Sequence, residues 1–501
     1  MVNKKIQMKA RNGNEWDNLF PLTLNENVFN SSGLSLNTQL ESIENILEKK
    51  ADKTFVDSEI ERLNNEVVTN KSEVETNLNV LNSKVSKNHY YLDNANNLQQ
   101  ALLQAEGGVL FLKKQTYLIN EIIKIPSNIR IEGNGAIFRR NNDDINSMFT
   151  NDSNGNIGEY DANENIEINN VKFDGMNSSK CSIISFAHVK NIKITNCIFY
   201  NLERMHMIEF NSSKNVLVEN NEFIDYSLNG TGSEMIQIDL AIAPNVFPWF
   251  GPYDATPCEN IKIINNLFKN GFRAIGTHSA GAGMFHSRIT IEHNEFINMK
   301  EDTIRGLDWA YTKINHNHFV NVHRGIVLRV QETTLNNHVI DGNYMSGLPD
   351  DTNSRAILIF GKSNGDYAIN GGSIIDNRIK RFGGHGIGIN NSERWTIRGN
   401  DVTTTGRSGI LLYGAIDVIV TENNCFNNGI NPDLNDESFV VMNESKNIII
   451  NSNNTDIIRV ADDSTVTSVM NNLVKDEMKL AGTNTYAVNN IVNKLHVPIT
   501  E

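Results

Sequence analysis

The amino-acid sequence predicts an all-β fold, a single-stranded parallel β-helix preceded by an α-helical coiled-coil stalk. The main observation is a pair of motifs, I-x-x-N-x-F and then G-I-x-I-x, that recurs along most of the 501 residues. The steps between repeats are mostly 23 to 28 residues, with two longer steps of 45 and 34. A period in this range is typical of a solenoid, in which each repeat buries its apolar face against its neighbours. The ends of the first motif lie at Phe173, Phe199, Phe223, Phe268, Phe296, Phe319, Met345, Ile379, Val402 and Phe426.

Each repeat has the pattern of one β-helical coil. Short runs alternate apolar and polar residues, as in Ile192-Lys193-Ile194, and the corners are rich in asparagine. No stretch within a repeat has helical periodicity, so we interpret the runs as strands. The asparagines two residues before the repeat ends are expected to form a ladder that satisfies backbone groups at each turn. They are Asn221, Asn266, Asn294, Asn317, Asn343, Asn377, Asn400 and Asn424.

Two segments precede the repeats. Residues 1–34 mix polar and aromatic side chains and are too short for a robust domain, so we interpret them as a small head. In residues 35–92 apolar side chains recur at spacings of three and four, proline is absent, and charged residues fill the other faces. This pattern, interrupted around residues 70–72, predicts a coiled coil with a stutter. Because such a stalk cannot bury its seam as a monomer, we expect an oligomer, and a trimer in particular.

The β-helix itself is predicted over residues 93–462, with a short helix near its start. Residues 463–501 keep some apolar alternation but lose the repeat signature. Two interpretations stay open for this last segment, a terminal irregular coil or a tail that closes a trimer.

Composition narrows the classes of partner. The formal net charge is −14, from 45 basic and 59 acidic residues, which argues against nucleic acid or an anionic membrane as partner. The four cysteines lie far apart without C-x-x-C spacing, so neither a disulfide framework nor a zinc site is predicted. The first residues lack the apolar core of a signal peptide, and no run approaches the roughly 18 apolar residues of a membrane span. We therefore expect synthesis without a signal peptide, no membrane insertion, and no metal or other cofactor.

The stretch that opens the solenoid, GGVLFLKKQTYLINEIIKIPSNIRIEGNGAIF at 107–138, resembles the first coils of pectate-lyase-like (pectin-lyase-like) right-handed β-helices. Together with the short head and the helical stalk, it resembles the bacteriophage tailspikes and receptor-binding depolymerases over nearly the whole chain. The resemblance implies a homotrimeric spike of the virion, attached to the phage tail or baseplate through residues 1–34. It also implies that the β-helix binds, and usually cleaves, a bacterial surface polysaccharide such as a capsule or a biofilm exopolysaccharide.

Polar side chains gather at the outward positions of five successive repeats. Because side chains alternate between faces along a strand, the isoleucine of the second motif and the residue two beyond it should point inward. The outward positions carry Glu209, Gln237, Asp239, His278, Arg305 and Arg329, whereas later repeats carry Leu358, Phe360, Leu411 and Tyr413. With strands stacked about 4.8 Å apart, the polar groups would form one patch roughly 20 Å long. Acid, amide, imidazole and guanidinium groups in one stripe predict a functional site.

The 45-residue step supports the same location. Part of its excess length is residues 241–258, directly after Asp239, and insertions in solenoids often form loops on the binding face. The aromatic side chains of this insertion are suited to stacking on sugar rings. The alternative is that they cap the groove or pack against a neighbouring subunit. The residues concerned are Phe247, Trp249, Phe250 and Tyr253.

The carboxyl groups of the stripe suggest glycoside hydrolysis, which needs one general acid and a second carboxylate as base or nucleophile. Glu209 and Asp239 would be diagonal neighbours on adjacent strands, about 7 to 8 Å apart at the backbone. Both retention and inversion are reachable from that spacing. Asp254, in the insertion, could pair with Asp239 instead, and Asp308 is a third candidate.

The other polar residues would assist this chemistry. We expect His278 to orient the sugar or to tune the pKa of the acid. The expected substrate-binding residues outside the aromatic insertion are Gln237, Arg305, Asp308, Arg329 and Trp309.

Two rival functions remain. A lyase that acts by β-elimination from a uronic acid would need a base and a cation, which His278 and the stripe arginines could supply. A calcium ion in such a lyase needs clustered oxygen ligands, for which the candidates are Glu209, Asp239 and Asp254. A receptor-binding protein or adhesin would instead hold a glycan or teichoic acid in the same groove without cleaving it.

Overall fold

The computed structural model divides the chain into two units, residues 1–86 and 87–501. The described residues of the first unit are 8–12, 15–19, 41, 60, 61, 63, 64 and 67. Those of the second unit are 89–92, 97–152, 155–227, 234–243, 251–279, 281, 283–331, 335–361, 369–430, 437–482 and 486–496. In the first unit, β1 (Met8–Asn12) and β2 (Glu15–Leu19) form an antiparallel pair.

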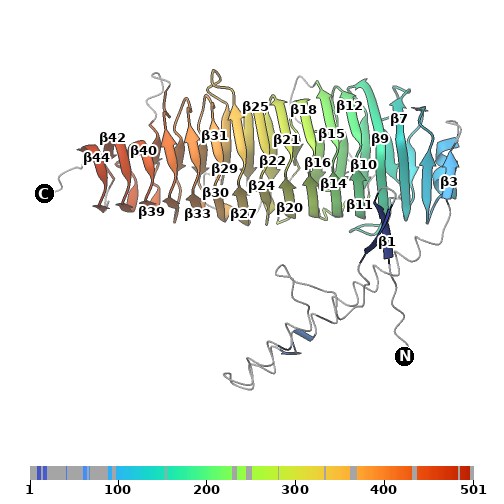
Figure 1. Ribbon diagram of the computed structural model, residues 1–501, viewed down its shortest axis with the longest axis horizontal. Coiled ribbons are helices and arrows are strands. Elements are labelled where there is room, and N and C mark those ends of the chain that lie inside the picture. Colours follow the sequence, from blue (N-terminus) through green and yellow to red (C-terminus); the bar gives the residue numbers. More distant parts are fainter. Residues whose placement is uncertain are drawn as a thin grey trace. The chain divides into compact units, whose positions relative to one another are not determined.

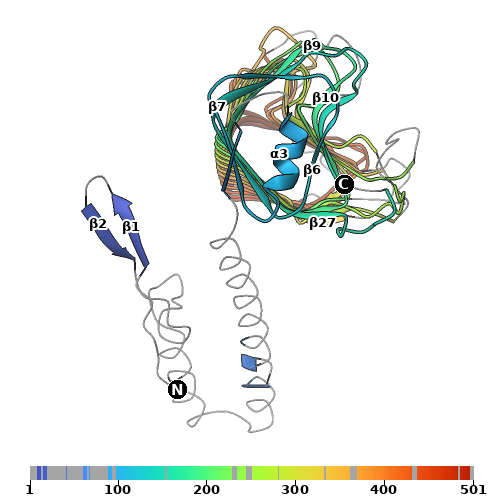
Figure 2. The same ribbon diagram turned by 90° about the vertical axis from the view of Figure 1, so that its right-hand side faces the viewer.

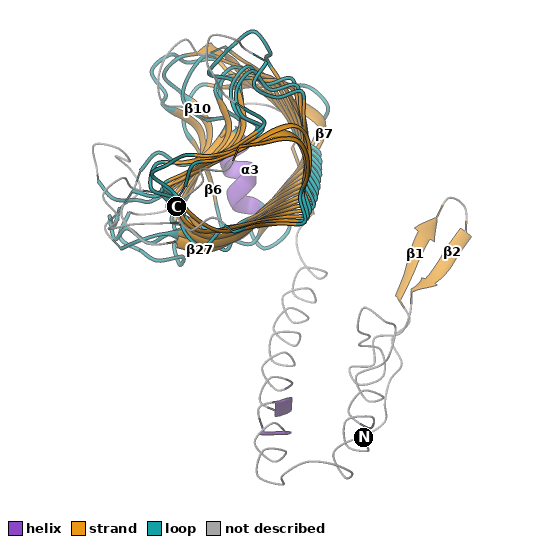
Figure 3. Ribbon diagram, turned by 90° about the vertical axis from the view of Figure 1, so that its left-hand side faces the viewer, coloured by secondary structure: helices purple, strands orange, loops and turns teal. Residues whose placement is uncertain are grey.

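The second unit is a right-handed parallel β-helix, seen in Figure 1 as a long row of stacked strands. Each strand pairs in parallel with the strand one coil further along the chain, and parallel crossovers of this kind are right-handed in nearly all proteins. Figures 2 and 3 look along the row and show the coils superposed, with strands in the walls and loops at the corners.

One stack of strands carries the second motif, and we call its outer surface the site face. It consists of β6 (Ile123–Ile125), β8 (Ser147–Asn151), β10 (Ser182–Ala187), β13 (Ile208–Asn211), β16 (Ile236–Asp239), β19 (Ile275–Gly276), β22 (Asp302–Leu307), β26 (Arg324–Arg329), β29 (Arg355–Phe360), β32 (Ile387–Asn390), β35 (Ile410–Tyr413) and β38 (Phe439–Met442).

Two further stacks close the coils. The next along each coil contains β11 (Val189–Thr195), β14 (Lys214–Glu219), β17 (Glu259–Ile264), β20 (His286–Glu292), β23 (Trp309–Ala310), β24 (Lys313–Asn315), β27 (Leu335–Asp341), β30 (Ile369–Ile375), β33 (Glu393–Arg398), β36 (Ile419–Thr421), β39 (Lys446–Asn451), β41 (Thr465–Met470) and β43 (Ala487–Val488). The last contains β12 (Ile198–Leu202), β15 (Glu222–Tyr226), β18 (Leu267–Gly271), β21 (Glu295–Met299), β25 (His318–Val322), β28 (Tyr344–Gly347), β31 (Arg378–Lys380), β34 (Asp401–Thr403) and β37 (Asn424–Phe426). Longer strands join stacks near the two ends, namely β7 (Ile129–Arg140), β9 (Asn163–Ser178), β40 (Asn454–Val460), β42 (Leu473–Leu480) and β44 (Ile491–His496).

A short helix covers the first coil. The solenoid begins with β3 (His89–Leu92), α3 (Leu98–Gln104), β4 (Val109–Leu112) and β5 (Thr116–Ile119). Leu98 and Leu102 of α3 are buried in the core, and Figure 2 shows the helix lying across the end of the coils. The Gln99 side chain donates to the carbonyl of Lys124 and accepts from its amide, at 2.9 and 2.7 Å. The helix therefore covers apolar groups that the first coil would otherwise expose, the role of a solenoid cap.

The interior is built from repeated apolar side chains. The rings of Phe173, Phe199, Phe223, Phe268, Phe296 and Phe319 stack one on the next, with centroid separations of 4.7, 4.9, 4.8, 5.0 and 4.7 Å. These separations match the spacing of neighbouring strands, so the ring stack keeps the coils in register.

An asparagine ladder runs beside the ring stack and was predicted with one error. In each rung the side-chain oxygen of one asparagine accepts from the backbone and side-chain nitrogens of the asparagine one coil earlier, as from Asn317 to Asn343 at 2.9 and 3.0 Å. After Asn400 the ladder continues through Asn423, not through the predicted Asn424. The later members are Asn453, Asn472 and Asn490.

The ends of the solenoid bear on the predicted boundaries. β3 pairs with β4, so the first strand of the solenoid lies inside the range 35–92 that predicts the stalk. The rest of that range lies almost wholly outside the described residues. From residue 463 onward, β41 to β44 continue the parallel pairing through His496, which favours the terminal coil among the two interpretations. No helix in the described parts of the chain is long and apolar enough to cross a membrane, and all four cysteines are buried thiols.

Candidate functional site

Three columns of outward side chains run along the site face, because neighbouring strands pair in register through the inward isoleucines. The residue directly before that isoleucine also lies in the core, as Met235 and Ala274 do, so the alternation is broken there and the residue before it points outward. The first column, two residues before that isoleucine, holds His206, Glu234, Arg273, Asp302, Arg324, Arg355 and His385. The middle column holds Glu209, Gln237, Gly276, Arg305, Val327, Leu358, Gly388 and Leu411. The last column holds Asn211, Asp239, Leu307, Arg329, Phe360, Asn390 and Tyr413, with His278 just beyond the end of β19.

Three carboxyl groups and two imidazoles lie together at the N-terminal part of these columns. We call this group the acid cluster; its members are His206, Glu209, Glu234, Gln237, Asp239 and His278. Glu234 lies at its centre and is fully buried. Its carboxylate lies 3.2 Å from Nδ1 of His278 and 3.5 Å from the Arg273 guanidinium. Gly276 makes room for this carboxylate, because a Cβ there would lie 2.8 Å from Cγ of Glu234.

Glu234 and His278 form a charged pair. Burial opposes ionisation of Glu234, yet the hydrogen bond and the charge interaction with His278, aided by His206 and Arg273, lower its pKa to about 2. Burial likewise opposes the charge on His278, but Glu234 together with Asp239 and Glu209 raises its pKa to about 9. At neutral pH the pair therefore consists of a carboxylate and an imidazolium.

Asp239 has the opposite electrostatic character. Burial raises its pKa to about 6, although His278, Gln237 and the amide of Leu240 all favour the carboxylate. Gln237 Nε2 donates to Asp239 Oδ2 at 2.7 Å, and that oxygen lies 3.8 Å from Nε2 of His278. Asp239 can thus hold its proton up to about pH 6, whereas Glu234, in the same cluster, is already ionised there.

Glu209 borders Asp239 diagonally. Glu209 pairs with Gln237 and Asn211 with Asp239 in the register of β13 and β16, so Glu209 and Asp239 are diagonal neighbours on adjacent strands, as predicted. Their backbone positions are roughly 8 Å apart, from a strand spacing of about 4.8 Å and a two-residue rise. Ser185 on the preceding strand donates to Glu209 Oε2 at 2.8 Å, and 8% of Glu209 is exposed.

His206 supports the cluster from the first column. Its ring lies parallel to that of His278, with centroids 5.8 Å apart, and its Nδ1 lies 2.9 Å from the carbonyl oxygen of Glu234. Burial lowers the pKa of His206 despite the nearby Glu209 and Glu234 carboxylates. A neutral His206 is therefore compatible with the imidazolium of His278 beside it.

The predicted pair of Asp254 with Asp239 is not seen. Asp254 accepts hydrogen bonds from the amides of Glu159 and Thr256, at 2.7 and 3.0 Å, and lies 4.0 Å from Nδ1 of His188. Its loop thus packs on the coil at His188, which begins two strands before Asp239. The calcium site considered for Glu209, Asp239 and Asp254 fails for the same reason, and no group of three or more potential ligands is arranged for a metal in the described parts of the chain.

Asp308 and Trp309 lie inside the wall of the coil. Asp308 has a positive φ of 51° and accepts a hydrogen bond from the amide of Gln331 at 2.7 Å. Trp309 is buried, and its indole N–H donates to Thr277 Oγ1 at 2.7 Å. Both residues therefore brace the turn after β22, and neither presents its side chain to a ligand on the site face.

The aromatic insertion is described only in part. Tyr253 is half-buried and packs with Ala187 and Ile242, which agrees with the capping interpretation for this side chain. Phe247, Trp249 and Phe250 lie outside the described residues.

A group of arginines follows the acid cluster along the columns. Burial lowers the pKa of Arg305, and the neighbouring Arg273 adds to this effect. Arg324 pairs with Glu301 and with Asp302. Arg329 lies over the ring of Phe360, 5.1 Å from its centroid. The buried Nε atoms of Arg305 and Arg329 have no hydrogen-bond partner in the described parts of the chain, so these guanidinium groups retain donors for an acceptor.

The sequence interpretation missed Glu234, Arg273 and His206. It considered only the positions one and three beyond the first isoleucine of the motif, whereas these three residues precede it by two. Charged residues or histidine recur at that position in seven successive repeats. Strict alternation of side chains places this position inward, however, and the core residue between it and the isoleucine, which breaks the alternation, was not foreseen.

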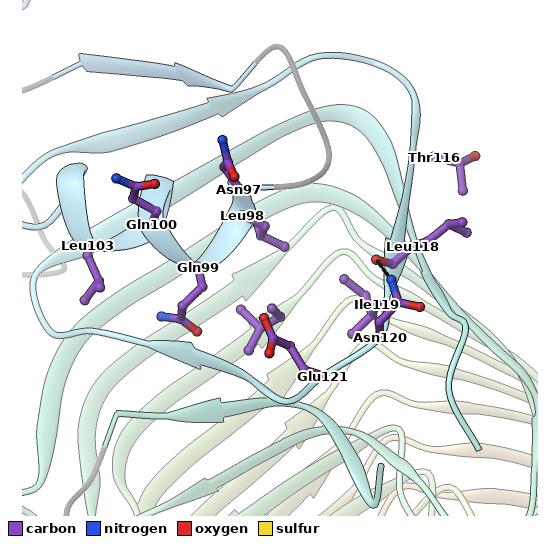
Figure 4. Close-up of a pocket in the computed structure, with 11 residues that line it drawn as sticks. Asn97, Leu98, Gln99, Gln100, Leu103, Thr116, Leu118, Ile119, Asn120 and Glu121 are labelled. Carbon is purple, nitrogen blue, oxygen red and sulfur yellow. Dashed lines mark hydrogen bonds between the residues drawn. The ribbon is translucent and has the colours of Figure 1, made fainter. Parts of the chain in front are cut away.

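Two of the cavities that described residues line lie away from the acid cluster. The larger, of about 710 Å³, lies between α3 and the first coils and is shown in Figure 4. Its lining is mostly amide and aliphatic, and its one carboxylate is Glu121, so it offers no pair of groups for acid–base chemistry. The smaller, of about 280 Å³, lies on the site face itself, toward the C-terminal coils.

The chain is similar in sequence or structure to several known proteins. No protein-family model matches the chain. It is 28% identical over 250 residues to plasmin and fibronectin-binding protein A of Streptococcus pneumoniae, a match that spans 42% of this chain and 34% of that protein. The chain thus spans about a third of the length of this curated relative.

Three solved structures illustrate the similarity. The crystal structure of PfbA, a surface adhesin of Streptococcus pneumoniae, matches with a TM-score of 0.59 and 19% identity over 70% of this chain and 88% of that one. Tailspike protein 3 of bacteriophage CBA120 matches with a TM-score of 0.48 and 14% identity over 82% and 60%. A family 28 exopolygalacturonase of Yersinia enterocolitica matches with a TM-score of 0.47 and 13% identity over 65% and 76%. At these identities the adhesin shows a shared fold and nothing further.

Proposed function

We propose that this chain cleaves a polysaccharide by hydrolysis of a glycosidic bond, with Asp239 as general acid and Glu209 as base or nucleophile. The observation that carries the proposal is the contrast within the acid cluster. Burial raises the pKa of Asp239 to about 6, while a second carboxyl group lies diagonally across the adjacent strand. Glycosidases require a protonated acid and a second carboxyl group, and backbone positions roughly 8 Å apart let the two side chains reach the carboxyl separation of a retaining or an inverting enzyme.

His278 would assist as a cation. When Asp239 gives its proton to the leaving oxygen, a buried carboxylate forms, and the His278 imidazolium 3.8 Å away would stabilise it. Glu234 keeps His278 charged and oriented through Nδ1. Glu234 is therefore proposed as a positioning residue, not as a residue that touches the sugar.

Substrate would enter beside His278. The side chain of His278 is 29% exposed, whereas Asp239 is buried. A sugar would therefore contact the imidazole first, and the side chains that cover Asp239 would have to move before it reached the carboxyl group. Arg305 and Arg329 lie one and two strands beyond His278. Their guanidinium groups would bind hydroxyl or acidic groups of the neighbouring sugar units.

The finer proposal is a homotrimeric phage tail spike that acts outside the cell on a bacterial capsule or exopolysaccharide. The order of head, predicted stalk and β-helix supports it. Residues 1–34 would then attach the spike to the phage tail or baseplate.

The test is incubation of the full chain with a panel of bacterial surface polysaccharides, recording new reducing ends and the absorbance of unsaturated uronides. We expect reducing ends without that absorbance, lost in Asp239→Asn and Glu209→Gln. Asp456→Asn removes another buried carboxyl, on β40, and is the control for folding. Absorbance together with reducing ends would replace hydrolysis by β-elimination.

A binding protein without catalytic activity is the second candidate. The sequence similarity to a plasmin- and fibronectin-binding protein favours it. Tight binding of a polysaccharide that yields no new ends, and that is unaffected by Asp239→Asn, would support this candidate against the hydrolase.

A further inference from the structure

The smaller cavity on the site face combines cationic and apolar walls. It has a volume of about 280 Å³ and is lined by Arg355, Leu358, His385, Asn390, Arg407, Leu411, Tyr413 and Met442. Leucine, methionine and tyrosine side chains offer apolar contacts, and Asn390 offers an amide. The size lies just below that of typical small-molecule sites, which suits a sugar ring with its apolar C–H faces and its hydroxyl groups.

The cationic wall has unused hydrogen-bonding capacity. His385 is 4% exposed, and its buried Nδ1 has no hydrogen-bond partner in the described parts of the chain. The buried Nε of Arg355 also lacks one. Arg355 and Arg407 both line the cavity, so their like charges repel, and burial together with this repulsion lowers the pKa of Arg355. Among the described residues no carboxylate lines the cavity, and an anion bound there would relieve this repulsion.

The cavity continues the columns of the acid cluster. Leu358 and Leu411 belong to the column of Glu209, and Asn390 and Tyr413 to that of Asp239. Its strands β29, β32 and β35 lie four to six strands beyond β16, which is roughly 20 to 30 Å at the usual spacing. Arg305 and Arg329 lie between the two places on the same columns. A polymer laid across the strands can therefore reach both.

We propose that the Arg355–His385–Arg407 cavity binds an acidic sugar unit, one that bears a carboxylate, sulfate or phosphate, of a polysaccharide chain. Insofar as the same chain continues into the acid cluster, the inference rests on the proposed function and makes its substrate a polyanion. The guanidinium groups bind the acidic group, Nδ1 of His385 and the Asn390 amide bind hydroxyls, and the apolar residues pack against the ring.

Affinity electrophoresis of the full chain tests this site. The gels contain polygalacturonate, dextran sulfate or uncharged dextran. We expect retardation by at least one acidic polymer and none by dextran, and an apparent affinity about tenfold or more weaker in the double variant Arg355→Gln/Arg407→Gln. The control is Arg378→Gln/Arg398→Gln, which removes the same charge from β31 and β33 on other faces of the solenoid. Thermal unfolding of both double variants verifies that they fold.

Equal retardation of the wild type and the Arg355→Gln/Arg407→Gln variant would overturn the inference. So would equal retardation by dextran, or no retardation by either acidic polymer. Reducing-end assays on the same samples separate the two proposals. Retardation that depends on Arg355 and Arg407 supports the cavity site, and a failure to cleave both this bound polymer and the panel of bacterial polysaccharides then refutes the hydrolase alone. If the Arg355→Gln/Arg407→Gln variant cleaves the polymer as fast as the wild type and is retarded equally, the hydrolase proposal stands and the proposed binding site is refuted.

Discussion

At the scale of single residues, the acid cluster separates two carboxyl groups that the sequence alone does not distinguish. Both Glu234 and Asp239 are buried, and burial alone would raise the pKa of each. Glu234 gains a direct partner in His278 at 3.2 Å, while Asp239 lies 3.8 Å from the same ring. The closer contact is the stronger one. It lowers the pKa of Glu234 enough to outweigh burial, whereas the weaker contact leaves the pKa of Asp239 raised.

This difference predicts the pH dependence of cleavage. A general acid must be protonated, so the rate should fall as pH rises through about 6, the pKa of Asp239. Asp239→Asn should lower the rate about 100-fold or more and remove this dependence. Initial rates of reducing-end formation between pH 4 and 8 measure both effects. A wild-type rate that increases steadily across this range would assign the proton to another group.

The charged pair predicts a pH dependence of stability. The pKa of His278 is about 9 in the folded chain against an ordinary 6.5, so its stabilising effect is complete below pH 6.5 and is lost as pH rises through 9. The loss amounts to as much as about 3 kcal/mol. Glu234, with its pKa of about 2 against 4.5, is stabilising above pH 4.5 and loses its effect as pH falls toward 2.

Thermal unfolding at pH 6.5 and pH 9.5 checks the alkaline part. The wild type should lose stability between the two values, and His278→Gln should lose less because it has no imidazolium to deprotonate. Equal losses in the two proteins would contradict the pairing.

At the scale of elements, the repeat motif sufficed to predict the strands but not every position on them. Burial in the solenoid requires an apolar side chain at the same positions of each repeat, so the isoleucines and phenylalanines recur with a regular period that the sequence shows directly. The site-face columns depend instead on where each strand begins, as with Glu234. Asp254 and Tyr253 depend on the path of a loop of irregular sequence, and no periodicity fixes such a path.

The ladder offers a matched pair of substitutions. Asn423 is buried, donates to the carbonyls of Ile397 and Thr421, and donates to Asn453. Asn424 is exposed at the start of β37. Asn423→Ala leaves buried partners unsatisfied and should cost about 2 to 4 kcal/mol, whereas Asn424→Ala should cost less than about 1 kcal/mol. Denaturant unfolding of the two variants measures the difference, and a larger cost for Asn424→Ala would contradict the observed register.

At the scale of the whole molecule, the solenoid confines each interaction to neighbouring coils. The contacts within the acid cluster join residues of β13, β16 and β19 or of the turns beside them, all from one chain. A predicted trimer would thus be needed for avidity and attachment rather than to complete this cluster.

A fragment of residues 87–501 separates these roles. It contains every described member of the acid cluster and matches one compact unit. Sedimentation should give a trimer for the full chain and a monomer for the fragment, because the predicted coiled coil is absent from it. Cleavage per chain of a short oligosaccharide should be unchanged in the fragment, while binding of long polymers, which benefits from several linked sites, should weaken by at least tenfold. A monomeric fragment that has lost cleavage of short substrates while keeping its thermal unfolding transition would instead require a second chain at the site.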